Sequence, residues 1–282
     1  MLPIRATTPD GVALALHDLG GDGPPALLVH ATGFHGRVFG PLAQSLGHRF
    51  HLLAPDLRGH GESGVPADLK FDWAGFATDV LTAVDVLELE RPVGIGHSCG
   101  GAALLLAEEA RPGTFSALYC FEPVVSASDG SPTPELLSSL ARAARQRREV
   151  FGSRDEAYDN YASKPPLSVL DPRALAAYVE WGVEDLPDGT VRLRCRGENE
   201  ALIYERSFSH PAFANLTEVR CPTVIACGSD SDSFSTAALA PVAARIPGGR
   251  LEVLPGLGHF GPLEQPATVS ASVIRAIDPP PA

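Results

Sequence analysis

A serine in a glycine-rich turn is the residue of this sequence best suited to nucleophilic chemistry. Ser98 lies in Gly96-His97-Ser98-Cys99-Gly100, directly after an apolar run and directly before an Ala/Leu-rich segment. That order predicts a strand, a tight turn and a helix, with the serine hydroxyl held at the end of the strand. Because Gly-x-Ser-x-Gly is short and arises by chance, Ser98 needs partners elsewhere in the chain.

A histidine near the C-terminal end fits the role of general base. A serine hydroxyl becomes a good nucleophile when a neighbouring base takes its proton and a third group holds that base in the correct tautomer. His259 lies in Pro255–Phe260, which follows the apolar run Leu251–Leu254 and precedes a helix-like segment. We therefore expect His259 at the same sheet edge as Ser98. The histidines beside other predicted strands are expected to be structural: His30, His60 and His97.

Short apolar runs alternate with helix-like segments along most of the chain. This alternation predicts an α/β fold, with a mostly parallel sheet covered by helices on both faces. After an N-terminal hairpin of 4–8 and 12–17, we expect strands at 26–30, 50–54, 93–95, 115–121, 224–227 and 251–254, and helices at 38–46, 73–89, 102–110, 236–245 and 267–277.

One long segment interrupts the alternation. We expect residues 1–124 and 217–282 to form the core and residues 125–216 to form a mainly helical inserted lid. A helix is predicted from Pro134 with Thr133 as its N-cap, a second over 172–181, and a short strand over 191–195. An insertion after a central strand would cover the edge of the sheet that carries Ser98.

Composition excludes several classes of partner. The chain has 282 residues and a formal net charge of −12 at pH 7, which would repel nucleic acid and anionic lipid. The basic run 142–148 is interpreted as the solvent face of a helix. No apolar stretch approaches the roughly 20 residues that span a bilayer. We expect no membrane partner and a cytoplasmic protein.

Neither a metal nor a cofactor is expected. The cysteines number five and show no C-x-x-C spacing, and no H-E-x-x-H motif occurs. The run Gly256-Leu-Gly-His-Phe-Gly fits the pattern G-x-G-x-x-G, but no room remains after it for a dinucleotide-binding unit.

Three motifs in order make this sequence similar to the α/β-hydrolase superfamily, of the lidded esterase and lactonase type. They are Asp56-Leu-Arg-Gly-His-Gly-Glu-Ser, Gly96-His-Ser-Cys-Gly-Gly and Gly256-Leu-Gly-His-Phe, and the similarity covers nearly the whole predicted core. It implies an oxyanion hole formed by the N–H groups of Cys99 and Thr32. The sequence departs from the family at Ala31, where glycine is usual. Phe34 and His35 would line the floor of the site or simply pack in the core.

The acid that orients His259 has more than one candidate. In similar proteins it commonly stands three residues beyond a glycine after the next-to-last strand, and from Gly228 that position is Ser231. Asp230 and Asp232 flank it. A second position in the superfamily directly follows the strand after the nucleophile, where Glu122 stands. A carboxylate that ends an apolar run needs a partner, so we rank Glu122 first, then Asp232, then Asp230.

The expected activity is hydrolysis of a carboxylic ester or lactone through an acyl-enzyme on Ser98. The similarity argues against dehalogenase and epoxide hydrolase chemistry, which needs Asp at that position. Aromatic residues of the predicted lid favour a small hydrophobic or aromatic substrate, with Tyr161 and Trp181 among its contacts. The same catalytic residues would serve carbon–carbon bond hydrolysis or cofactor-free perhydrolysis, and a non-catalytic ligand receptor of the same fold is the alternative from another class.

Overall fold

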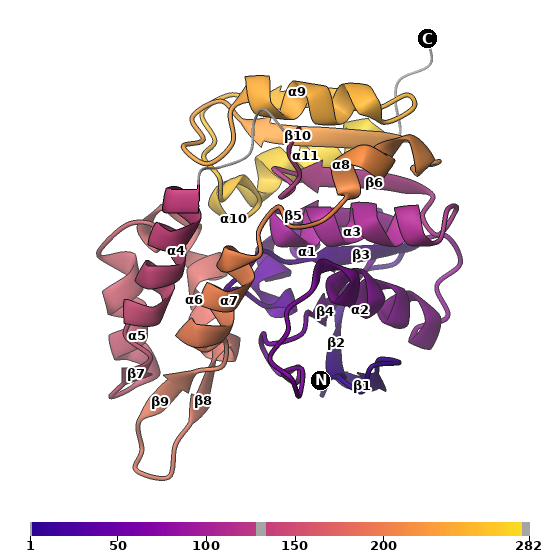
Figure 1. Ribbon diagram of the computed structural model, residues 1–282. Coiled ribbons are helices and arrows are strands. Elements are labelled where there is room, and N and C mark those ends of the chain that lie inside the picture. The colour runs from indigo at the N-terminus through magenta and orange to yellow at the C-terminus, as the bar shows by residue number, and fades with distance from the viewer. Residues whose placement is uncertain (1, 128–133, 278–282) are drawn as a thin grey trace.

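The computed structural model describes residues 2–127 and 134–277. Within them the main sheet has eight strands in the order β1-β2-β4-β3-β5-β6-β10-β11 (Figure 1). β2 pairs antiparallel with β1 and β4, and the other neighbours are parallel. The predicted fold class is confirmed. The strands are β1 Ile4–Thr7, β2 Ala13–Gly20, β3 Pro25–Val29, β4 His51–Asp56, β5 Val93–His97, β6 Ala117–Phe121, β10 Thr223–Gly228 and β11 Arg250–Leu254.

Helices cover both faces of this sheet. Side chains alternate between faces along a strand, and in β3 Leu27 packs into one apolar cluster while Leu28 packs into the other. α2, α3 and α9 contribute to the first cluster, and α1 and α11 contribute to the second. A strand buried on both faces explains the unbroken apolar runs in the sequence. The helices are α1 Gly40–Leu46, α2 Trp73–Val86, α3 Cys99–Ala110, α9 Thr236–Arg245, α10 Gly261–Glu264 and α11 Pro266–Ile277.

Between β6 and β10, the elements from α4 to α7 lie beside the sheet in Figure 1. Ser153 and Asp171 cap two of these helices, each accepting a backbone N–H of the first turn, and Leu175 and Val179 join the second cluster. The expected N-cap Thr133 falls outside the described residues. The elements are α4 Pro134–Gln146, β7 Val150–Phe151, α5 Arg154–Ala162, α6 Pro172–Gly182, β8 Val183–Asp185, β9 Val191–Leu193, α7 Gly197–Glu205 and α8 Ala212–Asn215.

Some elements differ from the expected ones. The helix expected at 38–46 begins as a 3-10 turn, Gly36–Phe39, before α1. The sequence did not predict α5 or α7. α5 buries only Ala157 and therefore has almost no apolar periodicity to detect. In α4 the apolar residues are not all buried, since Leu140 is 40% exposed while Ala144 is buried.

No helix of residues 2–127 and 134–277 is long and apolar enough to cross a membrane.

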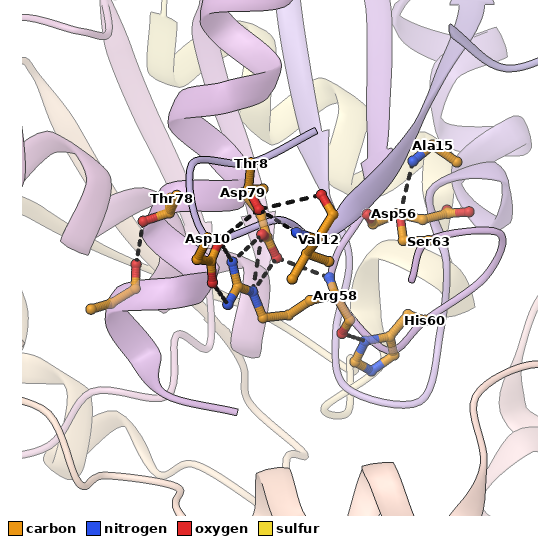
Figure 2. Close-up of polar contacts among 11 residues, drawn as sticks. Thr8, Asp10, Val12, Ala15, Asp56, Arg58, His60, Ser63, Thr78 and Asp79 are labelled. Carbon is orange, nitrogen blue, oxygen red and sulfur yellow. Dashed lines mark hydrogen bonds and ion pairs between the residues drawn. The ribbon is translucent and has the colours of Figure 1, made fainter. Parts of the chain in front are cut away.

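A buried arginine braces the turn that follows β4. The Arg58 side chain is 2% exposed, with Nη2 at 2.7 Å from Asp79 Oδ1 and Nη1 at 2.8 Å from Asp10 Oδ2 (Figure 2). The Asp79 carboxylate also accepts the Arg58 backbone N–H. A buried charge needs such partners, so this network fixes the Asp56–Ser63 motif against α2 and the β1–β2 turn.

Candidate active site

The backbone at Ser98 adopts the strained turn that the glycine pattern predicts. Ser98 has φ 53° and ψ −114°, a conformation that L-residues rarely adopt, and it connects β5 to α3. A Cβ on Gly100 would lie 2.1 Å from the Val29 carbonyl oxygen, and one on Gly96 would lie 2.6 Å from the Gly101 Cα. Glycine is therefore required on both sides of Ser98, and the serine side chain is held at the carboxyl end of the sheet.

Backbone hydrogen bonds tie this turn to the residue that follows β6. The Ser98 N–H donates to the Phe121 carbonyl over 2.9 Å, and the Val124 N–H donates to the Ser98 carbonyl over 3.2 Å. Glu122 lies between these two partners, with φ 45°, and its own N–H donates to Ala226. Ser98 and Glu122 are thus fixed on neighbouring strands of one sheet edge.

His259 contacts the carboxylate of Glu122. Its Nδ1 lies 2.6 Å from Glu122 Oε2, and the Glu122 side chain is fully buried. The Gly228 N–H donates to Oε1 over 3.0 Å. Because the carboxylate accepts, Nδ1 carries the proton in the neutral imidazole and Nε2 is left with a lone pair. His259 is therefore oriented as a general base requires.

The alternative acids do not occupy this position. Asp230 and Asp232 are exposed, and their carboxylates accept from the hydroxyls of Ser229 and Ser233 over 2.7 and 3.1 Å. The side chain between them, Ser231, donates its hydroxyl to Glu122 Oε2 over 2.8 Å. Among the three candidate carboxylates, Glu122 is the one in contact with His259.

His97 supports the loop that carries His259. Its Nε2–H donates to the His259 carbonyl over 2.8 Å, and the two ring centroids are 5.0 Å apart. Burial holds the pKa of His97 well below its usual range, so this imidazole stays neutral. His97 is structural, as expected, and it joins the serine turn directly to the His259 loop.

The two expected oxyanion donors lie on adjoining segments. Cys99 is the first residue of α3, where backbone N–H groups have no acceptor within the helix. The Thr32 side chain hydrogen-bonds the Cys99 thiol, which brings the loop after β3 against the start of α3. Burial raises the pKa of Cys99 to about 12, so the thiol remains protonated and unreactive.

A sequence model described as the alpha/beta hydrolase family matches residues 26–272. This chain belongs to that family. It is 25% identical over 92% of its length to 2-(acetamidomethylene)succinate hydrolase of Mesorhizobium japonicum, covering 89% of that protein. Two solved structures share the fold. A structure of E-2-(acetamidomethylene)succinate hydrolase superposes with a TM-score of 0.82, at 24% identity and with 98% of this chain and 99% of that one covered. The enol-lactonase of Burkholderia xenovorans LB400 superposes with a TM-score of 0.74, at 17% identity and with 98% of this chain and 100% of that one covered.

A buried histidine of this α/β hydrolase holds the loop after β3, which carries Thr32, in place. His30 donates from Nδ1 to the Ala31 carbonyl over 2.8 Å and accepts the Leu57 N–H at Nε2 over 2.9 Å. Burial lowers its pKa to about 3, so both hydrogen bonds belong to the neutral ring. His30 therefore connects the loop at Thr32 to the braced turn after β4, even though Ala31 replaces the usual glycine.

The expected substrate contacts fall into two groups in this hydrolase. Phe34 packs on Tyr178 and on Phe260, the neighbour of His259, with ring centroids 5.2 and 5.7 Å apart. Tyr161 lies edge-on to Tyr178 at 5.4 Å. The other two expected contacts are His35 and Trp181. His35 bonds the Tyr178 carbonyl at 3.2 Å, while Trp181 is 40% exposed beneath the Arg37 guanidinium and lines a surface pocket with Leu2 and His17. Substrate contact by any of these four stays a prediction.

Sequence reasoning missed one polar cluster of the hydrolase. Arg142, Arg145 and Arg148 are exposed as expected, but Arg147 is 19% exposed and pairs with Glu200. Its Nη2 also donates to the Tyr178 hydroxyl over 2.7 Å. A Cβ on Gly33 would lie 2.9 Å from Glu200 Oε1, so the pair borders the loop after β3 that carries Thr32. Because Arg147 and Glu200 are far apart in the chain, no local pattern could reveal their contact.

No group of three or more His, Cys, Asp or Glu side chains within the described ranges could hold a metal ion.

Proposed function

We propose that this α/β hydrolase cleaves a carboxylic ester or lactone through an acyl-enzyme intermediate. Ser98 is the nucleophile, His259 the general base and Glu122 the acid that orients it. The backbone N–H groups of Cys99 and Thr32 would stabilise the oxyanion. Residues 125–216 would act as a lid over the site.

Each step conserves atoms and protons. Ser98 Oγ attacks the carbonyl carbon as His259 Nε2 takes the hydroxyl proton. The carbon–oxygen bond to the leaving group then breaks, and His259 returns the proton to the alkoxide. A water molecule next gives a proton to His259 and attacks the acyl carbon. The bond from that carbon to Ser98 Oγ then breaks, and His259 returns the proton to Oγ, which releases the acid and restores Ser98.

The observation that carries this proposal is the 2.6 Å contact between His259 Nδ1 and the buried Glu122 carboxylate. A carboxylate in that environment stabilises the imidazolium that forms when His259 accepts a proton. The backbone just before Glu122 is bonded to the serine turn, because the Ser98 N–H donates to the Phe121 carbonyl. A strained serine and a carboxylate-bound histidine on neighbouring loops of one sheet edge are what acyl transfer requires, and ligand binding alone needs neither.

The surroundings favour an apolar substrate. Phe34, Tyr178 and Phe260 form an aromatic row that leads from the lid helix α6 to the residue beside His259. Ser98 as a whole residue is 7% exposed, so the lid segment must move or leave a narrow path for substrate to enter. We therefore propose a small hydrophobic or aromatic ester or lactone.

A second candidate is hydrolysis of an amide bond, which breaks the carbon–nitrogen bond and gives a carboxylic acid and an amine. The relative named 2-(acetamidomethylene)succinate hydrolase carries an acetamido group in its substrate's name, and the alignment covers most of both chains. The same serine, base and oxyanion donors would act on an amide carbonyl. An ester and its isosteric amide, assayed side by side, separate the two candidates by their kcat/KM ratio.

The test of the proposed function is covalent labelling together with turnover. A fluorophosphonate probe should add one label to the wild type, located on Ser98 by peptide mass spectrometry, and activated esters of graded chain length should be hydrolysed. Ser98→Ala should abolish both, whereas the control Ser233→Ala, at an exposed serine, should keep both. A wild type that neither labels nor hydrolyses any member of an ester, lactone and amide panel favours a non-catalytic receptor.

The location proposed is the cytoplasm. All five cysteines are buried and unpaired within the described residues, which is usual for proteins kept in a reducing compartment. Fractionation of cells that make the full-length protein, followed by immunoblotting, tests this location.

A further inference from the structure

We propose that Ser231 is a positioning residue for the catalytic pair, and that its hydroxyl sets how strongly Glu122 supports a proton on His259. The proposal rests on the proposed function for its catalytic meaning. It rests on the contacts of Ser231 for its physical meaning, since neither the Ser98 motif nor the His259 motif includes this residue.

The Ser231 hydroxyl is fully engaged. It donates its hydrogen to Glu122 Oε2 over 2.8 Å and accepts the backbone N–H groups of Ser233 and Phe234 over 3.2 and 3.3 Å. Because both N–H groups must donate, the hydroxyl hydrogen is left to point at the carboxylate. The short turn after β10 therefore fixes both the position and the polarity of this hydroxyl.

Glu122 Oε2 consequently receives two donors, Ser231 and His259 Nδ1, among the described residues. A hydrogen bond from Ser231 draws negative charge away from the oxygen that faces the imidazole. His259 then gains less stabilisation of its protonated form than from a carboxylate without that donor. The hydroxyl would thus help to keep His259 unprotonated, as a base must be, toward lower pH.

The same serine also orders an aromatic side chain against the imidazole. The Phe234 ring lies over His259 with centroids 5.7 Å apart and planes 30° from parallel. The Phe234 N–H is one of the groups that bond the Ser231 hydroxyl. One side chain therefore fixes both the carboxylate behind His259 and a ring that covers its face.

The position of Ser231 explains why this loop still matters although it carries no catalytic acid. It stands three residues after Gly228, where the similarity to the superfamily would place the acid. Here the acid is Glu122 on the neighbouring strand, and the smaller serine leaves room for that carboxylate while donating to it. Ser231 takes the place of an acid and serves as the donor to one.

The test compares Ser231→Ala, Ser231→Thr and the control Ser233→Ala. We expect Ser231→Ala to lower kcat about tenfold with KM little changed, because the Glu122 carboxylate and the Phe234 ring lose the contact that fixes their positions. The missing donor should also move the acid limb of the kcat/KM profile upward by about half a pH unit. Ser231→Thr keeps a hydroxyl and should restore kcat to within about threefold. Ser233→Ala should match the wild type.

A measurement that needs no turnover keeps the proposal separate from the proposed function. NMR titration of the His259 ring signals should give a higher midpoint in Ser231→Ala than in the wild type, and an unchanged one in Ser231→Thr. This result supports the positioning role even if no substrate is hydrolysed. Identical titrations in Ser231→Ala and Ser233→Ala, or equal kcat losses in the Ala and Thr variants, would overturn it.

Discussion

His259 Nδ1 lies 2.6 Å from Glu122 Oε2, and Glu122 follows β6 although the loop after β10 carries two aspartates. The buried carboxylate is held by the Gly228 N–H, by the Ser231 hydroxyl and by His259 itself. Asp230 and Asp232 remain at the surface. The loop after β10 therefore contributes donors to the Glu122 carboxylate, and the negative charge beside His259 comes from the end of the neighbouring strand.

The strained turn at Ser98 should not tolerate a side chain at Gly100. In Gly100→Ala the added Cβ would lie 2.1 Å from the Val29 carbonyl oxygen, and backbone cannot move away cheaply. Displacing the Ser98 hydroxyl by 1 Å should lower kcat/KM by about 100-fold or more. Ester kinetics and thermal melting test this.

Gly40→Ala is the matched control for that substitution. Gly40 begins α1, has φ −44°, and nothing lies within 4 Å of its added Cβ. This variant should keep full activity and equal or higher thermal stability, since alanine favours the helix. Loss of activity in both glycine variants would argue against a specific requirement at Gly100.

Removal of the buried guanidinium should destabilise the fold. Arg58→Met leaves the Asp79 carboxylate, 0% exposed, without its cationic partner, and breaking a buried pair in this way costs about 3–5 kcal/mol. Asp10→Asn is the control, because the Asp10 side chain is 51% exposed and its pair with Arg58 should contribute less than about 1 kcal/mol. Urea unfolding measures both free energies.

Acid should destabilise the protein through its buried histidines. Burial lowers the pKa of His30 to about 3 and that of His35 to about 4, from 6.5. The unfolded chain binds these protons below about pH 6.5, while the folded chain does not until about pH 3–4. The free energy of unfolding should therefore decrease as the pH is lowered from about 6.5 to about 3–4, by up to about 1.4 kcal/mol per pH unit for each histidine.

Urea unfolding of His35→Gln between pH 6.5 and 4.5 isolates one share of this dependence. The variant should lose less stability than the wild type over that range, because glutamine binds no proton. His48→Gln, at an exposed histidine, should follow the wild-type slope. Equal slopes for all three proteins would show that His35 is not held neutral by burial.

Part of this site could be predicted from sequence because the relevant signals are local. Gly96 and Gly100 are dictated by backbone approach within the turn, and His259 follows a recognisable strand. Glu122 ranked first of three candidate acids, because it ends an apolar run, where a carboxylate needs a partner, and because it stands at a second acid position of similar proteins. These features depend on residues close together in the chain.

The remainder depends on contacts between distant segments. The pairing of Arg147 with Glu200 joins α7 to the residue just after α4, and the hydrogen bond from Ser231 to Glu122 joins two loops. α5 buries only Ala157, so it has no apolar stripe that would mark its full length as a helix. Packing selects these partners, so they emerge only when the fold is known.

The most direct test of the account is the kcat/KM of Glu122→Gln beside that of Asp232→Asn, on the best ester substrate. Glutamine keeps the size of Glu122 but removes its charge, so kcat/KM should fall by about 1,000-fold or more. Asp232→Asn, which alters an exposed carboxylate, should stay within about twofold of the wild type. Full turnover in Glu122→Gln, with activity lost in Asp232→Asn, would contradict the assignment of Glu122 as the acid that orients His259.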